Sequence, residues 1–248
     1  MRVGVLVQMN DTDKLEEQLA GLRGMEMESC QLVCWNQAIM TDETARFVNA
    51  MLDRYQVQVT AFWCGWPGPV TWDFYDGQLN LGLVPAAYRN ERLNALITGS
   101  GFAKKLKVRD LITHVGFLPE NPYDENYHGI LVALKQIVRV CADNGQRFLF
   151  ETGQETPVTL LRTIQDIGME NVGINLDPAK LILYGKANPV DALEVFGKYI
   201  MGIHGKDGIY PVDGRHLGEE KPLGEGRVDY PRLIKKLKEL GYDGDISI

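Results

Sequence analysis

Three residues that can bind a metal ion follow three consecutive short apolar segments of the chain. The segments and the residues after them are 148–150 with Glu151, 172–176 with Asp177, and 200–203 with His204. These three residues lie at intervals of 26 and 27 residues, which is the length of one right-handed β-α-β crossover. Two carboxylates and an imidazole suit a divalent ion such as Mn²⁺, Mg²⁺, Co²⁺ or Zn²⁺ better than a sulfur-loving metal. The alternative is that each is an ordinary polar residue where a strand runs into a loop.

Short apolar segments alternate with segments of helical periodicity along the whole chain. The expected strands are residues 3–7, 29–35, 57–62, 110–117, 148–150, 172–176, 200–204 and 245–248. The expected helices are residues 11–24, 42–52 with Thr41 as cap, 89–105, 130–141, one that begins at Pro157, 189–199 and 230–240. Eight strands and seven helices without a linker predict one α/β domain over residues 1–248, a (β/α)8 TIM barrel.

A doubly wound open sheet is the competing fold, but no glycine-rich phosphate-binding sequence follows the first strand. In a barrel, the loops that follow the strands share one face, so Glu151, Asp177 and His204 are expected to converge. The last helix is missing, because the sequence stops at Ile248 in the eighth strand. We therefore expect an open seam between the last and first strands, and a natural chain that continues further.

The segment 63–87 interrupts this alternation with tryptophans, prolines and glycines. A loop of that length in a compact domain usually has a function. Its aromatic rings could form an apolar wall against which a sugar stacks, or they could simply pack the loop down as a lid. The sequence leaves both interpretations open.

Composition describes an ordinary globular protein of 248 residues, with 45% hydrophobic and 24% charged residues. The net charge of −7 disfavours nucleic acid and anionic membrane as partners. The cysteines have neither zinc-site spacing nor the density of a disulfide scaffold, so we expect reduced core thiols; they are Cys30, Cys34, Cys64 and Cys141. Neither a signal peptide nor a membrane-spanning segment is evident, and a cytoplasmic location is expected.

Four segments of the second half closely resemble the sugar phosphate isomerase/epimerase family of the xylose isomerase-like TIM barrel superfamily. They are Glu151-Thr152-Gly153-Gln154-Glu155, Asn175-Leu176-Asp177-Pro178, Gly202-Ile203-His204-Gly205-Lys206-Asp207 and Pro222-Leu223-Gly224-Glu225-Gly226. The resemblance covers essentially the whole chain in element order and is strongest from His114 onward. It is specific for the superfamily and weak for the substrate.

The resemblance implies roles for individual residues. Glu151, Asp177 and His204 match three of four ligands of one divalent ion, with Mn²⁺ expected first and Mg²⁺, Co²⁺ or Zn²⁺ as alternatives. Glu151 also matches one of the two glutamates that move a proton in relatives, which makes it the expected catalytic residue. The residues that match substrate-binding positions are His114, Glu155, Lys180, Lys206 and Arg215.

Two positions depart from the family pattern. Lys180 stands where many relatives have a histidine, so an ammonium would make that contact. The fourth ligand and second glutamate of relatives lies at the end of the eighth strand, and the sequence stops just short of it.

The implied activity is isomerisation or epimerisation of a keto-sugar or sugar phosphate by proton transfer through an enediolate. A metal-dependent lyase or dehydratase acting on keto-sugars or 3-oxo-glycosides is the main alternative. An apurinic-site endonuclease is disfavoured by the acidic composition and by a total of four histidines. A non-catalytic partner subunit is the remaining alternative, supported only by the missing final glutamate. The expected partner is a small carbohydrate, and barrels of this kind are often homo-oligomers.

Overall fold

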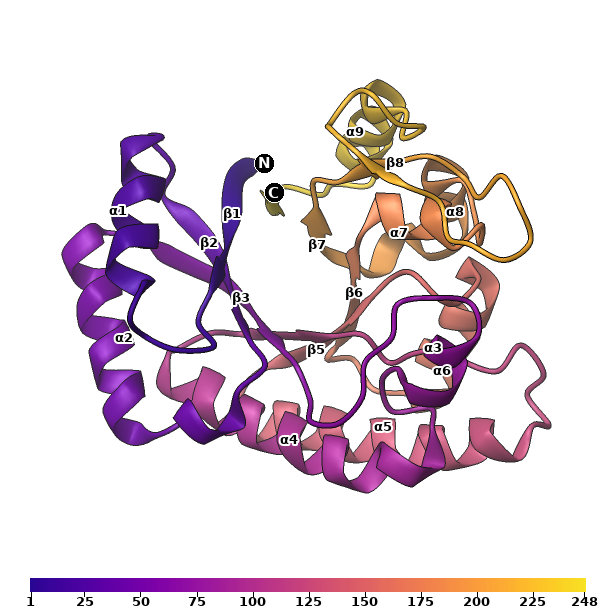
Figure 1. The fold of residues 1–248 in the computed structure, drawn as a ribbon, viewed down its shortest axis with the longest axis horizontal. Coiled ribbons are helices and arrows are strands. Elements are labelled where there is room, and N and C mark those ends of the chain that lie inside the picture. Colours follow the sequence, from indigo (N-terminus) through magenta and orange to yellow (C-terminus); the bar gives the residue numbers. More distant parts are fainter.

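Eight parallel strands close into a barrel in the computed structural model, which describes residues 1–248 (Figure 1). Around the barrel these are β1 (Arg2–Gln8), β2 (Ser29–Cys34), β3 (Gln58–Cys64), β4 (Asp110–Thr113), β5 (Arg147–Glu151), β6 (Val172–Leu176), β7 (Ile200–His204) and β10 (Asp245–Ser247). Every neighbouring pair is parallel, as expected when a helix connects one strand to the next. The predicted (β/α)8 barrel is confirmed.

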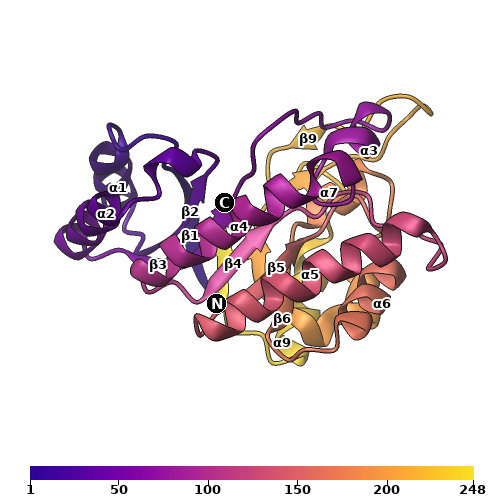
Figure 2. The same ribbon diagram turned by 90° about the horizontal axis from the view of Figure 1, so that it is seen from below.

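Helices surround the barrel, and α4 and α5 lie side by side across its outer face (Figure 2). The longer helices are α1 (Leu15–Gly24), α2 (Asp42–Tyr55), α4 (Ala86–Lys105), α5 (Glu125–Asp143), α6 (Pro157–Ile167), α8 (Pro189–Phe196) and α9 (Tyr230–Glu239). Short 3-10 turns are η1 (Gln37–Ile39) and η2 (Gly197–Tyr199). In α5, the apolar face packs into the core through residues at helical spacing, namely Ile130, Leu134, Ile137, Val138 and Cys141.

Two helices begin where the sequence predicts. The Thr41 side chain accepts a hydrogen bond from the Thr44 backbone N–H at 3.2 Å, which caps α2. Thr156 caps α6 in the same way, and Pro157 occupies the first turn of that helix, where its missing N–H costs nothing. Local side-chain chemistry therefore sets these helix starts.

Other elements differ from the sequence-based expectation. Two short helices, α3 (Asp76–Asn80) and α7 (Pro178–Leu183), were not expected, because five or six residues are too few to show a helical period. A two-stranded antiparallel ribbon of β8 (Asp207–Gly208) and β9 (Glu220–Lys221) was also missed. β4 ends at Thr113, so His114 lies just beyond the strand.

The expected open seam is wrong. β10 pairs with both β1 and β7, and the two chain ends lie next to each other (Figure 1). The Ile248 N–H donates to the Gly4 carbonyl at 2.9 Å, and the Leu6 N–H donates to the Ile248 carbonyl at 2.9 Å. The barrel closes through backbone pairing, and an outer helix is not needed for that pairing.

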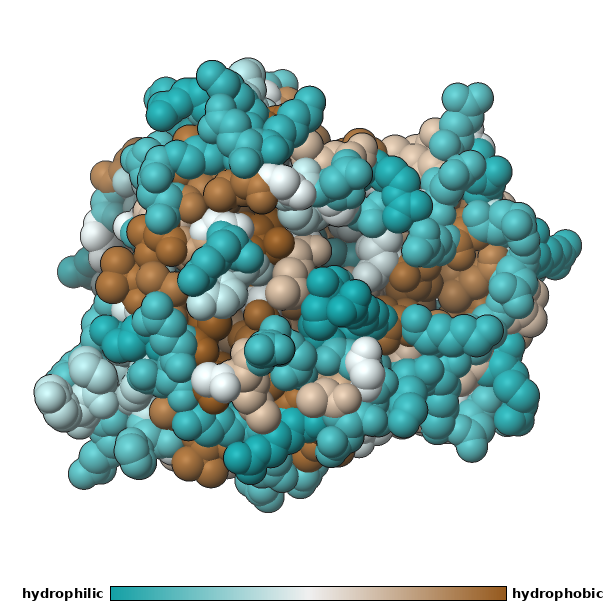
Figure 3. Space-filling model, turned by 180° about the vertical axis from the view of Figure 1, so that it is seen from behind, coloured by the Kyte–Doolittle hydropathy of each residue, from teal (hydrophilic) through white to brown (hydrophobic).

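The interior and the surface agree with the composition. The four cysteines are buried and free, as predicted. Hydrophilic side chains dominate the face in Figure 3, with hydrophobic patches between them. No helix combines the length and the apolar character needed to cross a membrane.

Candidate active site

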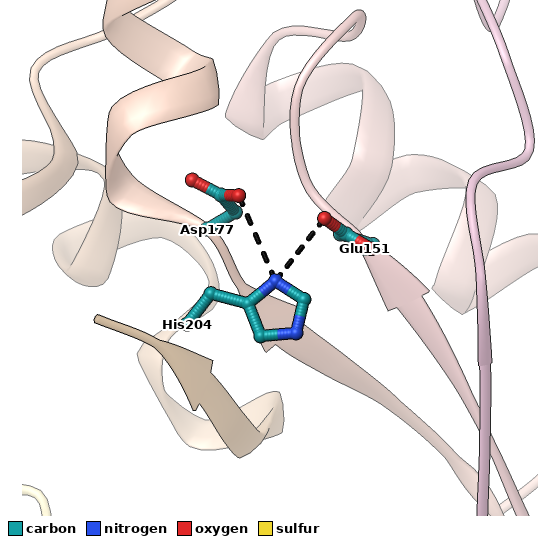
Figure 4. Close-up of side chains that lie close together, drawn as sticks. All are labelled: Glu151, Asp177 and His204. Atoms are coloured by element: carbon teal, nitrogen blue, oxygen red, sulfur yellow. Dashed lines mark ion pairs between the residues drawn. The ribbon is translucent and has the colours of Figure 1, made fainter. Parts of the chain in front are cut away.

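Glu151, Asp177 and His204 meet at the carboxyl end of the barrel (Figure 4). Glu151 ends β5, Asp177 directly follows β6, and His204 ends β7. One donor atom from each residue lies within 4.8 Å of the others, and all three side chains are buried. His204 Nδ1 is 3.2 Å from Glu151 Oε1 and 3.6 Å from Asp177 Oδ2. The structure thus brings the three expected metal-binding residues together.

Two atoms of this group have unmet bonding capacity. His204 Nδ1 and Asp177 Oδ2 are buried, and neither has a well-aligned hydrogen-bond partner. A buried polar atom without a partner costs about 1–3 kcal/mol, so such atoms are rare unless a water or an ion satisfies them. Two carboxylates and an imidazole nitrogen within reach of one point are a donor set that fits a divalent cation.

The position of Asp177 is fixed from two sides. Its Oδ1 accepts the Lys180 backbone N–H at 3.0 Å and so caps α7. The Thr152 hydroxyl bonds both the N–H and the carbonyl of Asp177, at 2.9 and 3.0 Å. One carboxylate oxygen therefore anchors the helix, and Oδ2 is left to face Glu151 and His204.

Cationic and polar side chains crowd Glu151. The Trp63 Nε1–H donates a hydrogen bond to its Oε2. Its Oε1 lies 3.1 Å from His114 Nε2 and 3.3 Å from Lys180 Nζ. The Lys180 ammonium also lies 2.5 Å from His114 Nε2. An indole thus holds one carboxylate oxygen, and the other contacts His114, just after β4, and Lys180 of α7.

These contacts determine which groups are charged. Burial would raise the pKa of Glu151, but His114, Lys180 and His204 together hold it well below its usual range. Burial would lower the pKa of His204, but the Glu151 carboxylate and Asp177 raise it to about 9. Burial lowers the pKa of His114 and keeps that ring neutral. Glu151 is therefore ionised, and a metal ion must displace a proton from His204.

A cavity of about 210 Å³ opens next to this cluster. Its lining combines aromatic rings, cations and two of the three candidate ligands: Leu6, Gln8, Val33, Trp35, Trp63, Trp72, Glu151, Lys180, His204 and Lys206. The Lys180 ammonium lies 4.5 Å from the centre of the Trp72 ring, a cation–π contact. Apolar walls with a few convergent charged groups are typical of a small-molecule site.

A family model described as xylose isomerase-like TIM barrel matches residues 18–248. The chain belongs to this family. Its barrel and the carboxyl-end position of its polar cluster agree with that assignment.

Three solved structures of xylose isomerase-like barrels are similar over the whole chain. The xylose isomerase domain protein from Planctomyces limnophilus is 31% identical, with a TM-score of 0.92, and the match covers 100% of this chain and 90% of that one. A D-tagatose 3-epimerase-like protein is 23% identical, with a TM-score of 0.76 and the same coverage. A xylose isomerase-like TIM barrel protein from Mycobacterium smegmatis, in complex with magnesium, is 14% identical, with a TM-score of 0.74 and coverage of 100% and 89%.

The other residues with expected substrate contacts divide into two groups in this xylose isomerase-like barrel. Lys180 and Lys206 line the cavity, and His114 lies behind Lys180 against Glu151. Glu155 and Arg215 do not line it. Glu155 is buried, and burial raises its pKa to about 7. Substrate contacts by all five stay predictions.

Arg215 lies in a second hollow of about 460 Å³ with Trp72, Tyr75 and His216. This hollow is lined by residues of the 63–87 segment and of the loop that follows β8. Trp72 lines both spaces and therefore stands between the cavity beside Glu151 and Arg215.

Sequence reasoning missed two polar residues that are linked to His204 by hydrogen bonds. Gln31 Oε1 lies 2.9 Å from His204 Nε2, and Gln31 Nε2 donates to Asn175 Oδ1 at 3.3 Å. Gln31 lies inside β2 and Asn175 inside β6, and every residue of both strands is buried. A polar amide within a buried strand was the signal that could have marked them.

Proposed function

We propose that this protein is a divalent-metal-dependent sugar isomerase or epimerase that moves a proton through an enediolate. The observation that carries the proposal is the unmet bonding capacity of Asp177 Oδ2 and His204 Nδ1, which face Glu151 beside the small cavity. The similarity to a D-tagatose 3-epimerase-like protein supports a keto-sugar as the substrate.

Glu151, Asp177 and His204 would hold the ion, with Mn²⁺ expected first and Mg²⁺, Co²⁺ or Zn²⁺ as alternatives. When bound, the ion supplies Lewis-acid polarisation of a carbonyl and its neighbouring hydroxyl, which acidifies the C–H bond between them. The low pKa of Glu151 makes it a weak base. Proton removal therefore depends on an acidified C–H bond.

Glu151 is the residue we assign to take that proton. It is the only carboxylate in the cavity lining, and Trp63 holds its Oε2 while Oε1 stays with His114 and Lys180. Return of the proton to the neighbouring carbon gives the isomer, and return to the opposite face of the same carbon gives the epimer.

The remaining walls orient the sugar. Lys180 and Lys206 offer ammonium N–H groups to hydroxyl or enolate oxygens, and Lys206 is held by an ion pair with Glu220 at 3.4 Å. Trp35, Trp63 and Trp72 provide an apolar surface for the C–H face of a sugar. Together these groups would bind one small polyol.

A metal-dependent lyase or dehydratase is the second candidate. Two ammonium groups line the same cavity as Glu151, and either could give a proton to a leaving oxygen after the C–H proton is removed. A keto-sugar or a 3-oxo-glycoside would then lose its β-oxygen substituent.

Solvent-proton exchange tests the proposal and separates the two reactions. Ketoses, their phosphates and 3-oxo-glycosides are incubated with Mn²⁺-loaded protein in D₂O, and NMR follows deuterium incorporation and product structure. We expect deuterium at one carbon of the substrate or of its isomer, and no exchange with Glu151→Gln. An unsaturated product would favour the lyase.

Metal content is measured on the same samples by elemental analysis and Mn²⁺ titration calorimetry. About one ion per chain is expected in the wild type and a loss of binding in His204→Ala. A wild type that binds no divalent ion would refute the proposed function.

A further inference from the structure

Three buried polar side chains from separate strands meet inside the barrel behind the candidate metal ligands. Gln31 lies on β2, Asn175 on β6 and His204 on β7, with exposed fractions of 3%, 0% and 2%. β1 and β10 separate β2 from β7 in the barrel order, so Gln31 reaches across the interior to His204. The contacts run from His204 Nε2 to Gln31 Oε1 at 2.9 Å, and from Gln31 Nε2 to Asn175 Oδ1 at 3.3 Å.

The direction of this chain of hydrogen bonds has a chemical consequence. An amide oxygen only accepts, so the Gln31 Oε1 contact requires a proton on His204 Nε2. In the neutral ring, the lone pair is then on Nδ1, the atom that faces Glu151 and Asp177. A metal-binding histidine usually has its other nitrogen held in this way, and the partner selects the tautomer.

Asn175 determines which end of the Gln31 amide faces the histidine. Without it, the Gln31 side chain could rotate and present its NH₂ group to His204, which would favour the wrong tautomer. Asn175 Oδ1 accepts from Gln31 Nε2 and so keeps the Gln31 oxygen on the histidine side. Asn175 therefore acts on His204 through Gln31.

Gly202 provides the space for this arrangement. It pairs with Asn175 in the β6–β7 register, and a Cβ atom at position 202 would lie 2.5 Å from Asn175 Oδ1. Any side chain there would push the Asn175 amide away from Gln31. A steric requirement therefore explains why a glycine stands two residues before His204.

We propose that Gln31 and Asn175 are positioning residues that hold His204 with Nε2 protonated and Nδ1 directed at the metal site, and that Gly202 keeps Asn175 in place. This inference rests on the proposed metal site, but the tautomer of His204 can be measured without any metal at a pH above the pKa of that ring.

The first test is Mn²⁺ affinity by titration calorimetry. Gln31→Leu removes the acceptor, and affinity falls about 10- to 100-fold, the loss typical of a removed hydrogen-bond partner of a metal-binding histidine. Gln31→Glu keeps an acceptor oxygen, and the Asn175 NH₂ group, which has no partner, can turn toward it. Affinity in Gln31→Glu stays much nearer to the wild type than in Gln31→Leu. Wild-type affinity in Gln31→Leu would overturn the proposal.

Gln146→Leu is the matched control. Gln146 is 3% exposed, like Gln31, and its side chain bonds Ser100 and Val108 at the other end of the barrel. Its loss lowers the thermal midpoint without changing Mn²⁺ affinity. Gly202→Ala is expected to weaken Mn²⁺ binding in the same direction as Gln31→Leu.

The second test is NMR of ¹⁵N-histidine-labelled, metal-free protein above pH 10, where the His204 ring, whose pKa is raised to about 9, is neutral; only four histidines contribute signals. His204 is assigned as the signal missing from His204→Asn. We expect the ¹⁵N shifts of His204 to show a protonated Nε2 and an unprotonated Nδ1 in the wild type and in Gln31→Glu, and a shift toward the Nδ1-protonated tautomer in Gln31→Leu. An unprotonated Nε2 in the wild type would overturn the proposal. If no variant binds metal, the proposed function fails, and this measurement still decides the role of Gln31.

Discussion

The two ends of the barrel have cavities of similar size but treat buried polar groups differently. The carboxyl end has a cavity of about 210 Å³ and several partnerless polar atoms, among them His114 Nδ1, Asp177 Oδ2 and His204 Nδ1. The amino end has a cavity of about 260 Å³, and three of its five charged lining residues, Asp110, Arg147 and Asp245, are in ion pairs. There, Arg147 donates two hydrogen bonds of 2.6 Å to the Asp110 carboxylate, and Arg2 donates two to Asp245, at 3.0 and 3.1 Å.

The pairing of polar groups distinguishes an end that can bind a ligand from an end that stabilises the fold, and cavity size does not. The charges of these two pairs have little capacity left for a ligand, and they stabilise the strands that they connect. Unpaired donors and acceptors at the carboxyl end cost free energy of folding and are available for a ligand. Substitutions at the carboxyl end should therefore change activity or ligand binding, and substitutions at the amino end should change stability.

The largest expected effect is at the carboxyl end. Glu151→Gln removes the proposed base, and we expect kcat to fall by about 10³-fold, within the range for loss of general acid–base catalysis. The amide oxygen still accepts the Trp63 N–H, so the fold is retained. Steady-state kinetics and a thermal melt check both parts. Full activity in this variant would remove Glu151 from the mechanism.

At the amino end, Arg147→Leu should act on stability alone. It leaves the Asp110 carboxylate buried without its partner, and we expect a loss of about 3 kcal/mol in the free energy of unfolding. Mn²⁺ affinity stays at the wild-type value. Urea denaturation and calorimetry make the measurement, and Arg147→Leu with Asp110→Asn should recover part of the loss. A large change in metal affinity would break the contrast between the two ends.

Glu155 is expected to destabilise the carboxyl end as the pH rises. Burial raises its folded-state pKa from 4.5 to about 7. Between these values the folded chain holds a proton that the unfolded chain releases, so stability falls as pH rises, and the penalty is complete above pH 7. Glu155→Gln removes it, which stabilises the protein at pH 8 by on the order of 2 kcal/mol and leaves stability at pH 4 nearly unchanged. Urea denaturation at both pH values checks this; an equal effect at each would contradict it.

Trp72→Ala should have the smallest effect and decides between the two interpretations of the 63–87 segment. If the ring stacks on a sugar, KM rises about 5-fold with kcat little changed, because uniform substrate binding is lost. Tyr75→Ala is the control, since Tyr75 is 58% exposed and lines only the outer hollow. Equal KM values in both variants would favour a lid without substrate contact.

Much of the fold could be predicted because its signals are local. Apolar runs, helical periodicity, the Thr41 cap and Pro157 depend on neighbours within a few residues. α7 was missed because its start depends on a cap by Asp177 and its length is six residues. Barrel closure was misjudged because the pairing of β10 with β1 joins opposite ends of the chain.

The sequence by itself determined the donor types, their order and their placement at the ends of consecutive strands, because strand spacing and chain direction follow from local patterns. Tertiary structure alone decided which atoms are left without partners, that Gln31 reaches His204 across the barrel, and that Glu155 stays out of the cavity. These properties depend on register and burial. A distance between side chains on β2 and β7 is set only when the barrel closes.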